Sequence, residues 1–105
     1  MEQSLNIDVQ TVLIAGRKDY IVQSYSEIAK KEGYQVLTAF TDEEVYKLLK
    51  GKTVNILLVG GGVEPNSRIG YREFIMQNNL ETRMIEHFGG PATLPQELQS
   101  SSKAS

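Results

Sequence analysis

The sequence has no cysteine, no tryptophan and a single histidine, His87, among its 105 residues. Without a thiol, the chain can form neither a disulfide framework nor a thiolate metal site nor a cysteine nucleophile. One histidine also excludes a histidine metal cluster and a paired histidine relay. No pair of carboxylates stands out as an acid–base couple. We therefore expect a non-enzymatic domain with no metal, no cofactor and no catalytic residue, folded on its hydrophobic core alone.

Strong charge and long apolar segments are absent as well. The formal net charge is only −2, so electrostatics gives no support for binding to nucleic acid or to an anionic membrane. The longest apolar run, Val54 to Val63, is interrupted by Asn55 and three glycines, and a membrane span needs roughly 20 residues. Residues 1–10 lack the basic flank and apolar stretch of a signal peptide. These features predict a cytoplasmic protein.

Short apolar runs recur along the chain and end in glycine-rich segments. They are continuous and rich in β-branched residues, which is typical of strands buried on both faces. We expect strands at residues 11–15, 35–40, 54–59 and 82–88. The chain is short enough for a single α/β domain over residues 11–99, with an N-terminal extension at 1–10 and a flexible tail at 100–105.

Apolar residues at helical spacing follow each predicted strand. Asp19 is expected to be the N-cap of the first helix, and Gly33 is expected to stop it. Thr41 and Glu44 have the spacing of a capping box at the start of a second helix.

The last two predicted helices begin near prolines. Pro65 lies just ahead of a third helix, with Asn66 or Ser67 as its cap. Its inward side chains are expected to be Ile69, Phe74, Ile75 and Met76. Pro95 suits the first turn of a final helix that runs through Leu98.

Strand and helix therefore alternate, which implies parallel strands, right-handed crossovers and helices on both faces. We predict a doubly wound, three-layer α/β/α sandwich with a four-stranded parallel sheet of order 2-1-3-4. An antiparallel α+β sandwich would need alternating strands and hairpin turns, and the sequence shows neither.

Residues 11–60 resemble the first half of a response-regulator receiver domain, which has a flavodoxin-like fold. The resemblance rests on the apolar first strand, on the segment EIAKKEGYQVLTAFTDEEVYKLLK and on VNILLV after it. In receivers, a helix ends in a Gly-Tyr-x-Val turn, the second strand ends near an alanine, and the second helix contains glutamate.

The chemistry of receivers is not expected in this chain. Receivers hold magnesium with two acidic residues after the first strand, where this sequence has Gly16–Lys18. Their phosphate-accepting aspartate ends the third strand, where this sequence has Val59–Gly61. They also have five strands and a lysine after the fifth, whereas this chain has room for four and residues 88–91 supply no lysine. The resemblance therefore argues against phosphoryl transfer.

Residues 56–98 are similar to the last two strand–helix units of cobalamin-binding domains. The similarity rests on ILLVGGGVEP and MIEHFGGPATL, and in that family such glycine loops receive a nucleotide tail. Those domains bring a histidine to cobalt from the loop after the first strand, and no histidine lies near Gly16. A four-stranded sugar-phosphotransferase component of similar size is phosphorylated on a cysteine, which this chain lacks.

Open parallel sheets bind ligands beyond the carboxyl ends of the strands, where the strand order reverses. Here that point lies between the first and third strands. The candidate ligand-binding residues come from the loops expected there: Gly16, Arg17, Lys18, Gly60, Gly61, Gly62, Glu64, His87, Gly89 and Gly90. Glycine amides could surround an anion, and the two cations would add charge.

Each of these residues also has a structural interpretation. The glycines could serve only to turn the chain, and Arg17 and Lys18 could lie in a solvated loop. Glu64 could cap the third helix, and His87 could end the fourth strand through a local hydrogen bond.

Two functions remain open on this basis. The first is a non-catalytic receiver-like domain that acts through protein binding or self-association, for which Tyr20, Tyr46 and Tyr71 would leave amphipathic surface on the helices. The second is a binder of a small anion, phosphate or nucleotide at the glycine loops. The first is favoured because each activity we considered lacks an essential residue.

Overall fold

Strands and helices alternate from end to end in the computed structural model, which describes residues 9–87. The order is β1 (Thr11–Ala15), α1 (Asp19–Lys31), β2 (Gln35–Ala39), α2 (Asp42–Gly51), β3 (Ile56–Val59), α3 (Pro65–Gln77) and β4 (Arg83–Glu86). The predicted final helix, Gly89, Gly90, the tail and residues 1–8 of the N-terminal extension lie outside the described residues. No helix between residues 9 and 87 is long and apolar enough to cross a membrane.

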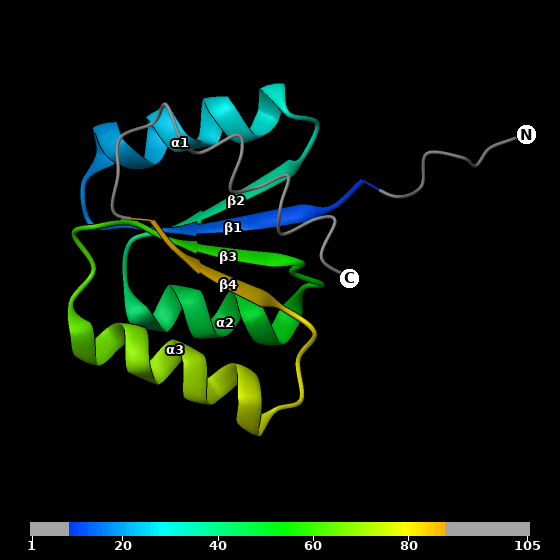
Figure 1. Cartoon of the computed structure of the whole chain (residues 1–105), viewed down its shortest axis with the longest axis vertical. Coiled ribbons are helices and arrows are strands. Elements are labelled where there is room, and N and C mark those ends of the chain that lie inside the picture. Colours follow the sequence, from blue (N-terminus) through cyan, green and yellow to red (C-terminus); the bar gives the residue numbers. More distant parts are fainter. Residues whose placement is uncertain (1–8, 88–105) are drawn as a thin grey trace, which may run out of the picture.

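The four strands form one parallel sheet in the order β2-β1-β3-β4, as the sequence predicted. Figure 1 shows α1 on one face of this sheet and α2 and α3 on the other. The strand order reverses between β1 and β3, so the carboxyl ends of these two strands lie next to each other. This is the place where the sequence predicted a ligand site.

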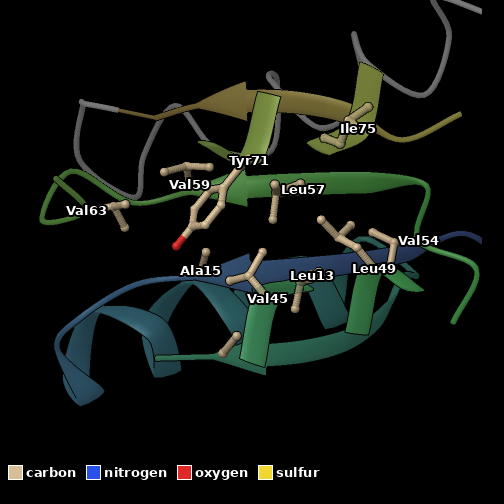
Figure 2. Packing of buried hydrophobic residues seen from close by; sticks show 11 residues of the cluster. Leu13, Ala15, Val45, Leu49, Val54, Leu57, Val59, Val63, Tyr71 and Ile75 are labelled. Carbon is tan, nitrogen blue, oxygen red and sulfur yellow. The ribbon is translucent and has the colours of Figure 1, made fainter. Parts of the chain in front are cut away.

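Alternate residues of the central strands supply the two halves of the core. Leu13 and Leu57 face α2 and α3, where Tyr71 packs against them (Figure 2). Val12 and Leu58 face α1. All four strand side chains are fully buried, which explains why the two runs are continuously apolar and not alternating.

The helix starts differ in part from their prediction. Asp19 is the first residue of α1, and the N-cap position belongs to Lys18, whose side chain makes no capping bond. The capping box of α2 does form on its Thr41 side, where the hydroxyl oxygen accepts a hydrogen bond from the Glu44 amide at 3.1 Å. The Glu44 carboxylate accepts from the Phe40 amide at 2.6 Å, one residue before the N-cap.

The predictions for the start and the inward face of α3 were right only in part. Pro65 itself begins the helix, Glu64 occupies the N-cap position, and neither Asn66 nor Ser67 caps it. Of the four side chains predicted to face inward, Ile75 is buried and Phe74 packs against the core, whereas Ile69 and Met76 are exposed. The other buried side chains of the helix are Arg68 and Tyr71. The burial of Tyr71 also removes it from the predicted amphipathic surface, although Tyr20 does lie there, at 68% exposure.

The reason for this error lies in the polar residues of the helix. Apolar spacing alone assigned the inward face, and the true face carries an arginine and a tyrosine whose polar ends bind partners at the edge of the sheet. Such side chains bury their apolar stems while their polar ends stay hydrogen-bonded. They therefore occupy inward positions that a purely apolar pattern does not reveal.

Candidate functional site

The loops after β1 and β3 meet at the carboxyl end of the sheet. The Gly60 amide donates a hydrogen bond to the Ala15 carbonyl at 2.9 Å, which joins the two strand ends. The residues just beyond stay close, because a Cβ atom added at Gly62 would lie 3.9 Å from the Cβ of Arg17. The structure therefore brings Gly16, Arg17 and residues 60–62 together, as the sequence predicted.

Arg17 lies at the centre of this edge. Its guanidinium donates to Asp42 Oδ1 at 2.8 Å and to the Phe40 carbonyl at 3.0 Å, and it forms an ion pair with Glu64 at 3.1 Å. Its side chain is only 22% exposed. The solvated-loop interpretation is therefore wrong for Arg17, whereas the exposed Lys18 fits it.

Asp42 joins Arg17 to helix α3. The hydroxyl of Tyr71 donates to Asp42 Oδ1 at 2.7 Å, and the hydroxyl of Ser67 donates to Asp42 Oδ2 at 2.9 Å. We call Arg17, Asp42, Glu64, Ser67 and Tyr71 the Arg17 cluster. The cluster links the loop after β1, the first turn of α2 and the start of α3.

The hydrogen bonds of the cluster shift the pKa values of its acids. The hydrogen bond from Tyr71, followed by those from Ser67 and Arg17, lowers the pKa of Asp42 although partial burial opposes the shift. Burial, together with the hydrogen bond to Asp42, raises the pKa of Tyr71 to about 12. A hydrogen bond from its own backbone, and then the charge of Arg17, lower the pKa of Glu64. Asp42 and Glu64 are therefore ionised and Tyr71 is a neutral donor at neutral pH.

These charges change what the site can bind. One arginine faces two carboxylates, so the three charged groups of the cluster sum to −1. A phosphate approaching Arg17 would meet two negative groups that already hold the guanidinium. The cation that the sequence offered for an anion site thus serves mainly to join helices α2 and α3 to the loop after β1.

A second arginine fixes the glycine loop. Arg68 is buried, and its guanidinium donates to the Gly60 carbonyl at 2.5 Å and to the Val63 carbonyl at 2.8 Å. It also pairs with Glu86 of β4 at 3.1 Å, and Arg72 pairs with the same carboxylate. Sequence reasoning missed Arg68. Its position three residues before Tyr71, on the same face of α3, is the signal that could have revealed it.

His87 does not reach the surface of the site. Its side chain is completely buried, and its ring stands edge-on to Tyr25 with centroids 5.2 Å apart. Its amide donates to the Val59 carbonyl at 2.9 Å, continuing the ladder between β3 and β4. The backbone of His87 therefore extends the strand pairing, and a ligand at the edge could not touch its ring without a rearrangement.

The need to turn the chain, which is one of the two interpretations of Gly60–Gly62, does not explain why these residues are glycine. The Val63 amide donates to the Gly60 carbonyl at 3.2 Å and closes a turn, yet none of the three glycines has a positive φ. Added Cβ atoms at the three positions would meet no atom closer than 3.5 Å. Neither backbone conformation nor space requires glycine here.

Gly16 is different, and this difference gives a testable prediction. A Cβ atom there would lie 2.5 Å from the Cγ2 of Val22, a stiff and buried side chain. We expect Gly16→Ala to lower the free energy of unfolding by about 1–3 kcal/mol through overpacking. Gly61→Ala is expected to raise it by about 0.4–1 kcal/mol, because alanine restricts only the unfolded chain. Urea unfolding of both variants checks the pair, and equal effects would contradict this account of the two loops.

The pKa shift of Asp42 predicts a loss of stability in acid. Because folding lowers the pKa of Asp42 below its ordinary value of 3.8, its contribution to stability is complete above that value. The contribution is lost as the pH falls through the lower, folded pKa. We expect the melting temperature to fall below about pH 4, and to fall less steeply in Asp42→Asn. Identical acid limbs in thermal unfolding of the wild type and Asp42→Asn would exclude this role for Asp42.

Comparisons with known proteins support the fold. No protein-family model matches the chain, and no curated protein matches it either. The chain is similar to a de novo designed Rossmann 2x2 fold protein solved by NMR in solution, with a TM-score of 0.68 and 14% identity, over 92% of this chain and 91% of that chain. A second de novo designed Rossmann fold protein gives a TM-score of 0.60 at 12% identity, over 90% of this chain and 98% of that chain. At these identities the likeness shows an α/β Rossmann-like fold and nothing about function.

Proposed function

We propose that the chain is a receiver-like, non-catalytic domain that acts by binding another protein or a second copy of itself. One observation carries the proposal. At the edge where doubly wound folds bind small ligands, Arg17 is already bonded to Asp42 and Glu64 of the same chain. An anion would have to displace both carboxylates, and each carries a full charge within ion-pair distance of the guanidinium.

The resemblance to receivers supports the same proposal from the sequence side. In receivers the residues after the first strand hold magnesium with carboxylates, and here a guanidinium lies at the corresponding loop. The third strand ends in Val59 and Gly60, which offer no carboxylate for a phosphoryl group. A domain with this pattern lacks the phosphoacceptor and the magnesium ligands of receivers, which supports binding to a protein as its function.

One observation favours a second candidate, the binding of a small anion at Gly60–Gly62. The fold does not require glycine at these positions, and two of the three, Gly61 and Gly62, are exposed. Glycine there leaves the amides open to a close approach from solvent. This candidate predicts that the chain binds a small anion, whereas the first predicts that it binds a polypeptide.

A titration of isotopically labelled protein separates the two functions. Phosphate, nucleotides and flavin are added to millimolar concentration while the backbone amides of residues 60–62 are followed by NMR. The proposal predicts that the resonances of these amides do not shift when the small anions are added. It also predicts that added peptides shift other amide resonances, or that sedimentation detects a dimer of the chain. Saturable movement confined to this loop, weakened in Arg17→Ala, would establish anion binding in place of the proposal.

A further inference from the structure

The strand β2 is the last strand at one end of the sheet that residues 9–87 form, on the side of helix α1 in Figure 1. Within residues 9–87 it is hydrogen-bonded to β1 alone. Edge strands of this kind are templates onto which another extended chain can add. A peptide can add to β2 only if backbone groups at this edge are available and if there is space for the side chains of the peptide.

The ladder between β1 and β2 shows which backbone groups of β2 do not bond its one neighbouring strand in the described part of the chain. The Gln35 amide donates to the Gln10 carbonyl at 2.9 Å, and the Ala39 carbonyl accepts from the Gly16 amide at 3.1 Å. In a parallel strand, the N–H and C=O groups of every second residue bond the neighbour on one side, and those of the residues between them point to the other side. The backbone groups of the odd-numbered residues of β2 therefore face β1. The N–H and C=O groups of Val36 and Thr38 therefore point outward, along the open edge.

A hollow lies directly beside these groups, between α1 and β2. It is lined by Asp19, Val22, Gln23, Ser26, Thr38 and Phe40, and its volume is about 190 Å³. Sites for small molecules and cofactors usually measure about 300–1,000 Å³. The hollow is therefore too small for a cofactor, but it could hold one long side chain.

The lining of the hollow indicates which side chain it would accept. Val22 and Phe40 give it apolar walls, and Asp19 of the first turn of α1 gives it a negative charge. Asp19 is exposed and has no ion-pair partner among the residues that the structure describes. Lysine and arginine combine an apolar stem with a cationic end, so they complement this lining.

We propose that the β2 edge and the hollow beside it bind an extended peptide segment of another protein, with a lysine or arginine side chain in the hollow. The segment adds to β2 as a further strand through Val36 and Thr38, and its basic side chain lies along α1 with its charge near Asp19. This inference rests on the proposed function, because it names the surface and the class of partner through which the domain would bind.

The test uses the full chain and a capped pentapeptide of threonine and valine with a central lysine. We expect the amides of Val36 and Thr38 to move in NMR titrations, while those of the opposite edge strand, β4, stay in place. N-methylation of the peptide provides the control for strand addition. Of two peptides methylated on successive amides, one is expected to lose binding, because only alternate amides face β2.

The contribution of Asp19 is measured with a matched pair of variants. Asp19→Asn is expected to weaken binding of the lysine peptide about two- to fivefold, the range of an exposed ion pair, and to leave a norleucine peptide unchanged. Glu43→Gln is the control, because Glu43 is also an exposed carboxylate in the first turn of a helix, on the opposite face of the sheet. It is expected to leave both affinities unchanged.

The possible failures are distinguishable. The β2 edge would be excluded as the binding surface if the peptide shifted amide resonances elsewhere in the protein, or if neither N-methyl group weakened binding. Either result would leave the proposed function intact. If Asp19→Asn and Glu43→Gln weakened peptide binding equally, the inference that a basic side chain lies near Asp19 would be wrong. If sedimentation detects a dimer and the peptide prevents its formation, the edge binds a second copy of this chain. That result would contradict the inference that it binds a segment of another protein. Anion binding at residues 60–62 without any polypeptide binding would overturn the proposed function itself.

Discussion

Replacing Tyr71 by alanine is expected to lower the free energy of unfolding by about 3–5 kcal/mol. The ring is completely buried in the core between the sheet and helices α2 and α3, where Figure 2 shows it beside Val59 and Ala15. Removing it leaves a cavity among side chains that cannot close around it. It also takes away the hydroxyl that donates to Asp42 at 2.7 Å. Urea unfolding followed by circular dichroism measures the change.

Tyr71→Phe separates the two contributions. It keeps the ring and removes the hydrogen bond that the hydroxyl donates to Asp42, a carboxylate that is 44% exposed, and the longer one that it accepts from Arg17 at 3.4 Å. We expect a loss of about 1–2 kcal/mol. It should also make the acid limb less steep, because the Tyr71 hydrogen bond is the largest cause of the lowered Asp42 pKa. If the phenylalanine variant were as unstable as the alanine variant, the ring would not be the main contributor.

Replacing Arg68 by methionine is expected to lower the free energy of unfolding by about 2–4 kcal/mol. Methionine keeps an apolar stem of similar length, but it removes the donor to the Val63 carbonyl and leaves the Gly60 carbonyl with the Val63 amide alone, at 3.2 Å. We also expect faster hydrogen exchange at the Val63 amide, which closes the turn on Gly60. Chemical denaturation and native-state exchange together check both effects.

The neighbouring arginine provides the control for Arg68. Arg72 pairs with the same Glu86 carboxylate, but its side chain is 52% exposed and it holds neither loop carbonyl. Arg72→Met should therefore lower stability by less than about 1 kcal/mol. Equal losses in the two variants would show that Glu86 pairing, and not the loop carbonyls, determines the role of Arg68.

The sequence was sufficient to predict the sheet because its signal is local and repeated. Residues 12–15 and 56–59 are continuously apolar, and a strand buried on both faces needs that pattern. The alternation with helices then leaves few parallel topologies. The capping box at Thr41 was also predictable, since its two residues lie three positions apart and bond within one turn.

The candidate site could be predicted only in its location. Gly16 and Gly60 were expected at one edge because parallel strands end together, and the structure places them there. The partners of Arg17 lie 25 and 47 residues further along the chain, at helix starts that have other local interpretations. The sequence analysis assigned no role to Asp42, and it offered Glu64 as a candidate ligand residue or as a helix cap. Which charges meet depends on the tertiary packing of α2 and α3, and local patterns do not encode it.

Asp42 and Glu64 hold the guanidinium of Arg17, and we propose that they thereby keep anions from binding at this edge of the sheet. The most direct test adds inorganic phosphate to the wild type and to the double variant Asp42→Asn/Glu64→Gln, while NMR follows the amides of residues 60–62 and the Arg17 side chain. We predict no saturable shift in the wild type at millimolar phosphate and a saturable shift in the double variant, because its guanidinium is no longer held by carboxylates. Phosphate binding by the wild type, or no binding by either protein, would contradict the claim.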